Sequence, residues 1–163
     1  MGSGKSSVGK ELAKLLQYQF IDLDEEIEKR EKKSISAIFS ESGEHHFRKT
    51  EQFVLKDIIH NNHVVIATGG GCALHENNFQ IMEKEGTTVY LEAHAGTLFH
   101  RLAPVKKNRP LIASKGDIEL MEYISDTLQE RSPYYHQAKI KTDAGGSISD
   151  VARTIEIQLH NNS

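Results

Sequence analysis

Three residues near the start of the chain, Gly4, Lys5 and Ser6, have the types and the order that bind a phosphate group. In the pattern G-x-x-x-x-G-K-[ST], backbone N–H groups surround the anion, the lysine reaches the β- and γ-phosphates, and the hydroxyl binds Mg²⁺. The residues from Met1 to Ser7 match the second half of this pattern. The opening glycine would precede Met1, as would the apolar strand that leads into such a loop. A flexible lead-in to a helix is the alternative interpretation, because G-K-S also arises by chance.

Two aspartates, Asp22 and Asp24, close a short apolar stretch that begins at Gln19. Side chains alternate along a strand, so a strand over 19–24 would place both carboxylates on one side. The carboxyl ends of parallel strands line the ligand site of α/β proteins, which predicts that both carboxylates face the phosphate loop. One is then placed to meet a metal ion, and the other to accept a hydrogen bond from a substrate hydroxyl. The alternative is that one of them caps the next helix, which is a far commoner role.

Three consecutive glycines, Gly69 to Gly71, come after a β-branched run from His63 to Thr68. The run fits a buried parallel strand. Glycines at its carboxyl end let the backbone approach a ligand closely, although a plain turn is the simpler interpretation. The run carries no aspartate of the kind that usually ends this strand in phosphate-loop proteins, which assigns the metal role to Asp22.

Basic residues offer candidate contacts for a phosphorylated ligand. Arg48 and Glu51 share one face of a predicted helix, and such spacing usually means a surface ion pair of little worth. A polar and basic stretch over about 104–116 includes Arg109 and lacks apolar periodicity. It suits a mobile lid that brings cations over a triphosphate, with a charged surface loop as the alternative.

Helices and strands alternate along the whole chain. Apolar periodicity predicts helices over 5–16, 25–29, 34–39, 43–59, 95–102, 118–130 and 148–159, and strands over 19–24, 63–68, 87–91 and 138–142. This alternation, without a repeat or a linker, predicts an α/β fold with a parallel sheet.

The composition is that of an ordinary globular protein and predicts one domain over residues 1–163. Charged residues make up 26% and hydrophobic residues 37% of the 163 residues, and the net charge of −3 gives no reason to expect nucleic acid as a partner. Cys72 is the only cysteine, which favours a reducing cytoplasm over a disulfide-forming compartment. No apolar run is long enough to predict a membrane span. The nine histidines are scattered without a metal-binding pattern.

With these features together, the chain resembles shikimate kinase along essentially its whole length. The resemblance rests on M-G-S-G-K-S, I-D-L-D, F-R-K-T-E, T-G-G-G, R-P-L and R-S-P-Y-Y, in this order and spacing. It implies a P-loop NTPase fold like that of nucleoside-monophosphate kinases, with a five-stranded parallel sheet in the order 2-3-1-4-5, of which the first strand is missing here. It also implies transfer of the γ-phosphoryl group of ATP to the 3-hydroxyl of shikimate, with Mg²⁺, by a monomeric enzyme of aromatic amino-acid biosynthesis.

The resemblance also implies roles for individual residues. Shikimate would be bound by Asp24, Arg48, Gly69, Gly70, Gly71 and Arg131. ATP would be bound by Gly2, Ser3, Gly4, Lys5, Ser6, Ser7, Arg101 and Arg109. Ser6 would ligate Mg²⁺ and Asp22 would support it through water, while Lys5, Asp24 and Arg109 would be the catalytic residues. A carboxylate held between Arg48 and Arg131 fits the preference of arginine for bidentate pairing.

Two departures from the family qualify these expectations. The family usually places an arginine near the adenine after the last strand, where this chain has Ala144-Gly145-Gly146, so Arg101 is expected to stack on the base alone. The missing first strand would be the middle of the sheet, so we expect the native polypeptide to begin about ten residues before Met1. Gluconate kinase, or a non-catalytic nucleotide-binding module, is the alternative identity.

Overall fold

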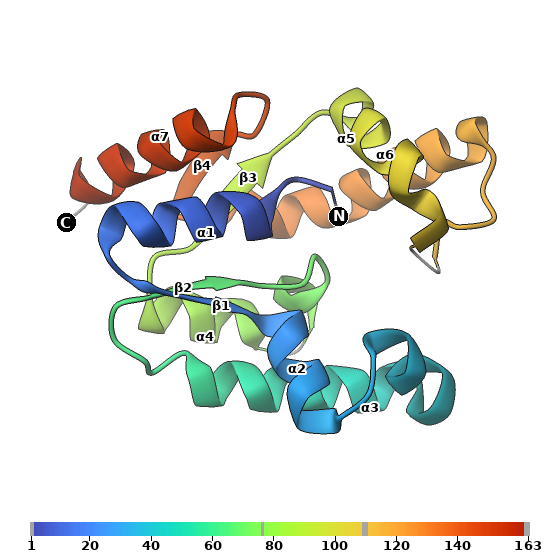
Figure 1. Cartoon of the computed structure of the whole chain (residues 1–163), viewed down its shortest axis with the longest axis horizontal. Coiled ribbons are helices and arrows are strands. Elements are labelled where there is room, and N and C mark those ends of the chain that lie inside the picture. Colours follow the sequence, from blue (N-terminus) through green and yellow to red (C-terminus); the bar gives the residue numbers. More distant parts are fainter. Residues whose placement is uncertain (1, 76, 109–110, 162–163) are drawn as a thin grey trace.

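The computed structural model describes residues 2–75, 77–108 and 111–161, in which helices and parallel strands alternate (Figure 1). In chain order the elements are α1 (Lys5–Leu16), β1 (Gln19–Asp22), α2 (Leu23–Glu31), α3 (Ile35–Ile58), β2 (Val64–Ala67), the 3₁₀ helix η1 (Cys72–Leu74), α4 (Asn78–Glu85), β3 (Val89–Glu92), α5 (Ala95–Leu102), the 3₁₀ helix η2 (Ala103–Asn108), α6 (Asp117–Tyr135), β4 (Ile140–Asp143) and α7 (Ile148–Asn161).

The strands form two separate parallel sheets. In one sheet β1 pairs with β2, with Gln19 opposite Val64, and in the other β3 pairs with β4, with Val89 opposite Ile140. The predicted order 2-3-1-4-5 counts the missing strand as strand 1, so β1 to β4 correspond to its strands 2 to 5. The two observed sheets are the outer pairs of that order. No strand lies between β2 and β3 among the residues that the structure describes.

A cavity of about 700 Å³ lies between the two sheets. All four residues of β2 and three residues of β3 line it, together with apolar side chains of α1, α4 and α7. The predicted strand is present, but Val64, Val65 and Ile66 are only half-buried. The prediction that this strand is buried is therefore only partly correct. The reason is that one edge of β2 faces the cavity instead of a neighbouring strand.

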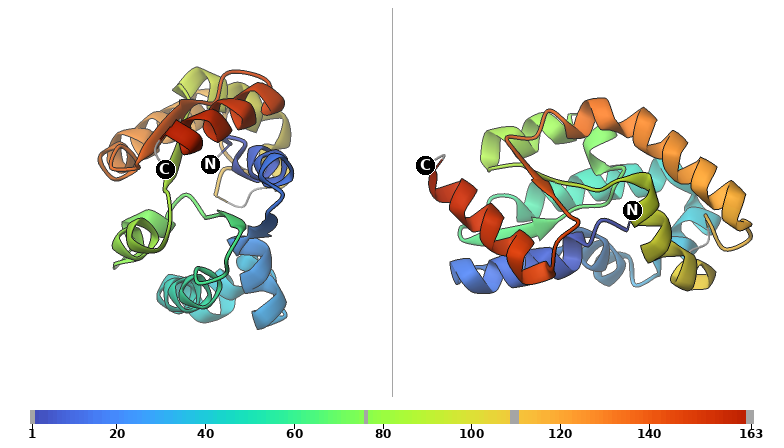
Figure 2. Two further views of the ribbon diagram at one scale, coloured as in Figure 1. Left: turned by 90° about the vertical axis from the view of Figure 1, so that its left-hand side faces the viewer. Right: turned by 90° about the horizontal axis from the view of Figure 1, so that it is seen from above.

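Apolar clusters fix the helices around this frame. One cluster joins α2 to α3, a second joins α5 to α6, and a third joins α1 to α7, which lie side by side in Figures 1 and 2. The long helix α3 contains a break at Gly43, whose φ of 79° favours glycine and divides the helix where two helices are predicted from the sequence. No helix in the described ranges is long and apolar enough to cross a membrane.

Several predicted boundaries are wrong. The strand predicted over 19–24 ends at Asp22, and Asp24 lies in the first turn of α2 because the Asp22 side chain caps that helix. The helix predicted over 118–130 continues to Tyr135 and contains Pro133. The helices η1 and α4 have no counterpart among the predicted elements. The predicted lid opens with η2, and Lys106 Nζ near its end donates to the carbonyl of Lys115 at 3.0 Å.

Candidate active site

The N-terminus of α1 has the geometry of an anion-binding helix start. Gly4 precedes the helix with a φ of 90°, in the left-handed region that glycine tolerates, and the first helical bond runs from Val8 N to the Gly4 carbonyl at 2.9 Å. No described side chain caps this end, and the first turn holds no acidic residue. The N–H groups of the first turn and the positive end of the helix dipole therefore suit a phosphate group.

Ser6 and Asp22 meet directly at this helix start. The Ser6 hydroxyl donates to Asp22 Oδ2 at 2.6 Å, and the Asp24 backbone N–H donates to Asp22 Oδ1 at 3.1 Å. Asp22 therefore caps α2 and also contacts the phosphate loop. A hydroxyl beside a carboxylate is a set of hard oxygen donors that fits Mg²⁺. The described residues contain no cluster of three or more metal-ligating side chains, and Mg²⁺ in kinases needs none, because phosphate oxygens and water complete its shell.

Asp24 lies close to the same loop. Burial raises the pKa of its carboxyl group, and the neighbouring Lys5 opposes this rise. Asp22, Glu28 and Arg48 also act on it electrostatically. The side chain is thus a half-buried carboxylate whose charged form is favoured by Lys5 of the loop and by Arg48, which suits an acceptor for a substrate hydroxyl.

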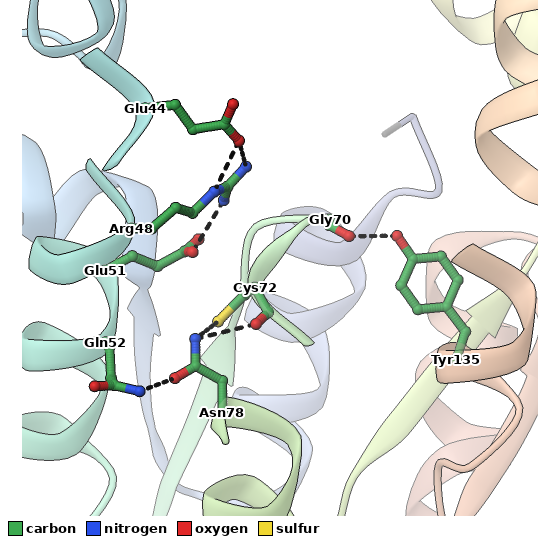
Figure 3. A network of polar contacts seen from close by, with 8 residues as sticks. All are labelled: Glu44, Arg48, Glu51, Gln52, Gly70, Cys72, Asn78 and Tyr135. Atoms are coloured by element: carbon green, nitrogen blue, oxygen red, sulfur yellow. Dashed lines mark hydrogen bonds and ion pairs between the residues drawn. The ribbon is translucent and has the colours of Figure 1, made fainter. Parts of the chain in front are cut away.

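Arg48 of α3 lies between two glutamates (Figure 3). Its Nη1 donates to Glu51 Oε2 at 3.0 Å, while Nε and Nη2 donate to Glu44 Oε1 at 3.2 and 3.1 Å. Glu51 is fully buried at 0% exposure, so the interpretation of this pair as a surface ion pair is wrong. Burial raises the pKa of Glu51, and the Arg48 guanidinium opposes the rise. Glu51 Oε1 is buried without a hydrogen-bond partner among the described residues.

The sequence contains a signal for the burial of Glu51 that the helix-face argument missed. The buried positions of the second half of α3 are Phe47, Glu51, Val54, Leu55 and Ile58. Their spacing is that of one apolar stripe, and Glu51 occupies a position in it. A charged residue inside such a stripe indicates a paired or functional carboxylate.

The glycine segment after β2, Gly69 to Gly71, is packed against this cluster. A Cβ atom on Gly71 would lie 2.9 Å from Arg48 Nη2, and one on Gly69 would lie 3.1 Å from Glu51 Oε1. A side chain at Gly69 or Gly71 would therefore crowd Arg48 and Glu51, which gives these glycines a packing role, while a binding role for the segment stays a prediction. Asn78 fixes the 3₁₀ helix beyond the glycines, since its Nδ2 donates to the Cys72 carbonyl at 3.0 Å.

Arg131 belongs to α6, on the other side of the glycine segment. Its Nε is buried without a hydrogen-bond partner among the described residues, which leaves a donor available to a ligand. One turn later on the same helix, the Tyr135 hydroxyl donates to the Gly70 carbonyl (Figure 3). Sequence reasoning assigned Tyr135 no role, because its partner lies 65 positions away and leaves no local pattern.

Arg101 and Arg109 differ in what the structure describes of them. Arg101 Nη1 donates to the Ser3 carbonyl at 3.2 Å and Nη2 to the Ala144 carbonyl at 2.7 Å, so the guanidinium joins the phosphate loop to the end of β4. This position beside the Ala144 turn is compatible with a role at the nucleotide. Arg109, the predicted lid arginine, lies outside the described residues, so its role stays a prediction.

Comparison with known proteins identifies the family. A family model described as shikimate kinase matches residues 1–159. A shikimate kinase from Parabacteroides distasonis is 43% identical over 144 residues, which cover 88% of this chain and 83% of the relative. A crystal structure of shikimate kinase from Bacteroides thetaiotaomicron has a TM-score of 0.93 at 37% identity and covers 98% of this chain and 94% of its own. Shikimate kinase from Acinetobacter baumannii in complex with shikimate has a TM-score of 0.92 at 33% identity. The match covers 100% of this chain and 90% of the Acinetobacter chain. With the phosphate loop, the paired aspartates and the buried Arg48–Glu51 pair in place, the chain belongs to the shikimate kinase family.

Proposed function

We propose that this chain transfers the γ-phosphoryl group of ATP to the 3-hydroxyl of shikimate, giving shikimate 3-phosphate and ADP. The observation that carries the proposal is the convergence of Asp24, Arg48 and the Arg131 helix on the glycine segment after β2. The similarity to a shikimate kinase in complex with shikimate supports the same acceptor.

The acceptor site matches the chemistry of a hydroxylated acid. Shikimate carries one carboxylate and three hydroxyl groups, and arginine binds a carboxylate with two parallel hydrogen bonds. Arg131 offers an unpartnered buried Nε among the described residues. Arg48 holds Glu51 on its buried side and Glu44, whose side chain is 61% exposed, on the other. We infer that the substrate carboxylate replaces Glu44 at Arg48 and joins Arg131, while Asp24 accepts from the attacking hydroxyl.

The phosphate side of the site supplies charge stabilisation, which accounts for most of the catalysis of phosphoryl transfer. We propose that Gly2 to Ser7 surround the β- and γ-phosphates, with Lys5 near the transferred group. Ser6 and Asp22 are the residues that would hold Mg²⁺, which neutralises phosphate charge when bound. Arg101 is proposed to contact the nucleotide from the Ala144 side, and the stretch over about 104–116 to close over it as a lid.

A coupled assay of ADP release tests the proposal directly. The purified chain is assayed with ATP and Mg²⁺, with shikimate, with gluconate and without an acceptor. The expected result is that ADP is released with shikimate, but not with gluconate or without an acceptor. Tight ATP binding without turnover of any acceptor would instead support a non-catalytic nucleotide-binding module, and turnover of gluconate would make the acceptor assignment wrong.

Replacing Arg131 with alanine is expected to raise the KM for shikimate by about 100-fold or more, because truncating one partner of a buried charge pair costs about 2–5 kcal/mol. The dissociation constant for ATP should change little, since no hydrogen bond or ion pair among the described residues joins Arg131 to the phosphate loop. Steady-state kinetics with shikimate varied, and ATP titration by calorimetry, provide the two readouts. An unchanged KM for shikimate would contradict the assignment.

Replacing Arg109 with alanine is expected to lower kcat by about 100-fold while the affinity for shikimate stays nearly constant. The reason is that a cation acting on developing charge contributes in the transition state and little in the ground state. Single-turnover kinetics with saturating shikimate measure the effect, with Lys107→Ala in the same stretch as the matched control. Loss of shikimate affinity with kcat preserved would make Arg109 a substrate-binding residue and the lid role wrong.

A further inference from the structure

The two arginines of the proposed carboxylate clamp come from separate parts of the fold. Arg48 lies on α3, which packs with α2 beside the sheet of β1 and β2. Arg131 lies on α6, which packs with α5 on the side of the other sheet (Figure 1). One small carboxylate can bridge both guanidinium groups only if their separation is fixed.

The glycine segment is the element that both parts contact. On one side Gly71 lies so close to Arg48 that a Cβ atom would come within 2.9 Å of Nη2. On the other side the carbonyl of Gly70, the preceding residue, accepts the hydrogen bond from the Tyr135 hydroxyl. Figure 3 shows this bond spanning the space between the loop after β2 and α6.

The Tyr135 ring is itself held in place. It packs against Tyr90 of β3 with ring centroids 5.1 Å apart. Tyr135 also lies one helical turn beyond Arg131, so the two side chains occupy the same face of α6. Burial raises the pKa of Tyr135, and the Arg131 guanidinium opposes this rise.

We propose that Tyr135 is a positioning residue for shikimate binding: its hydroxyl ties the Arg131 turn of α6 to the Gly70 carbonyl and so sets the distance from Arg131 to Arg48. The inference rests on the proposed function, since it needs a carboxylate that both arginines bind. Tyr135 touches neither ATP nor the transferred phosphoryl group in this scheme. Its effect is therefore confined to the acceptor.

The test is Tyr135→Phe, which removes the hydroxyl and keeps the ring against Tyr90. A net hydrogen bond of ordinary strength corresponds to about a 3- to 10-fold change in a binding constant. The KM for shikimate is expected to rise by about that factor, with kcat and the KM for ATP within about twofold of the parent. Tyr134→Phe is the matched control, because Tyr134 is exposed and adjacent in sequence, and it should change none of the three.

A double-mutant cycle separates positioning from a general structural role. If Tyr135 acts through Arg131, then Tyr135→Phe should leave the KM for shikimate unchanged in an Arg131→Ala background. Equal losses in both backgrounds, or a parallel rise in the KM for ATP, would overturn the inference. An unchanged KM for shikimate in Tyr135→Phe alone would do the same. Absence of shikimate-dependent ADP release in the parent chain would instead refute the proposed function, so the two failures are distinguishable.

Discussion

An Asp24→Asn variant is expected to lose about 10³-fold of kcat while still binding ATP and shikimate. Asparagine keeps the shape and one oxygen but cannot take a proton from the attacking hydroxyl, and general-base catalysis contributes about 10²–10⁴-fold. Burial raises the pKa of Asp24, and the charge of Lys5 opposes this rise. Rapid-quench measurement of shikimate 3-phosphate in a single turnover reports the chemical step. Glu28→Gln, also near Asp24 but bonded to the Ile35 N–H, is the matched control.

The pH dependence of the parent enzyme should carry the signature of the same carboxyl group. Burial raises its pKa above the ordinary value of 3.8, so activity, which needs the carboxylate form, should fall on the acid side at a higher pH than for an exposed aspartate. The effect on stability has the opposite sign. The folded state binds this proton more tightly than the unfolded chain, so the stabilisation is present at low pH and is lost as pH rises through the folded pKa. An acid limb of kcat/KM that persists unchanged in Asp24→Asn would assign the limb to another group.

A designed apolar strand of about ten residues, fused ahead of the chain so that it can pair with β2 and β3, is expected to raise the melting temperature by about 10 °C or more. The facing edges of β2 and β3 border the cavity of about 700 Å³, and backbone groups without partners cost about 1–3 kcal/mol each. Ser3 and Lys5 line the same cavity, so the fusion point lies near it. In a domain of this size each kcal/mol corresponds to about 2–4 °C.

The experiment compares three proteins: the 163-residue chain, the chain extended by the designed strand, and the chain extended by a Gly/Ser segment of equal length. Scanning calorimetry and ADP release give stability and activity. Only the strand extension should raise both the melting temperature and the rate of ADP release. If the 163-residue chain melts as cooperatively and turns over shikimate as fast as the strand-extended form, the argument from the open strand edges is wrong.

Local patterns predict most elements, whereas the pairing order of the strands is expected only from the resemblance to shikimate kinase. The helix over 95–102 is predicted with its observed bounds, because its apolar positions and flanking residues agree. Alternation alone assigns Asp24 to a strand, whereas the Asp22 cap starts α2 two residues earlier. The short helix α4 is missed because eight residues with a few apolar positions give little periodic signal.

The candidate site also contains some features that sequence patterns predict and others that they do not. The motifs locate Gly4 to Ser6, Asp22 and the glycine segment, and the binding roles of these residues stay predictions. The burial of Glu51 is readable from the apolar stripe of α3, but the usual surface location of ion pairs at that spacing argues against it. The bond from Tyr135 to Gly70 depends on tertiary packing across 65 positions, which no local pattern encodes.

Two buried atoms in the described part of the chain lack hydrogen-bond partners, Glu51 Oε1 and Arg131 Nε. At this site, stability and activity therefore make opposite demands. Each such atom costs the free protein about 1–3 kcal/mol of folding free energy. An apolar residue in place of Arg131 would relieve that cost and remove a group that the proposed substrate site needs, whereas one in place of Glu51 would also leave Arg48 without its buried partner. Consensus or computational redesign for heat tolerance would therefore tend to select against function here, and should hold both positions fixed. The same cost predicts that substrate protects the enzyme against proteolysis and heating, because a bound ligand can supply the missing partners.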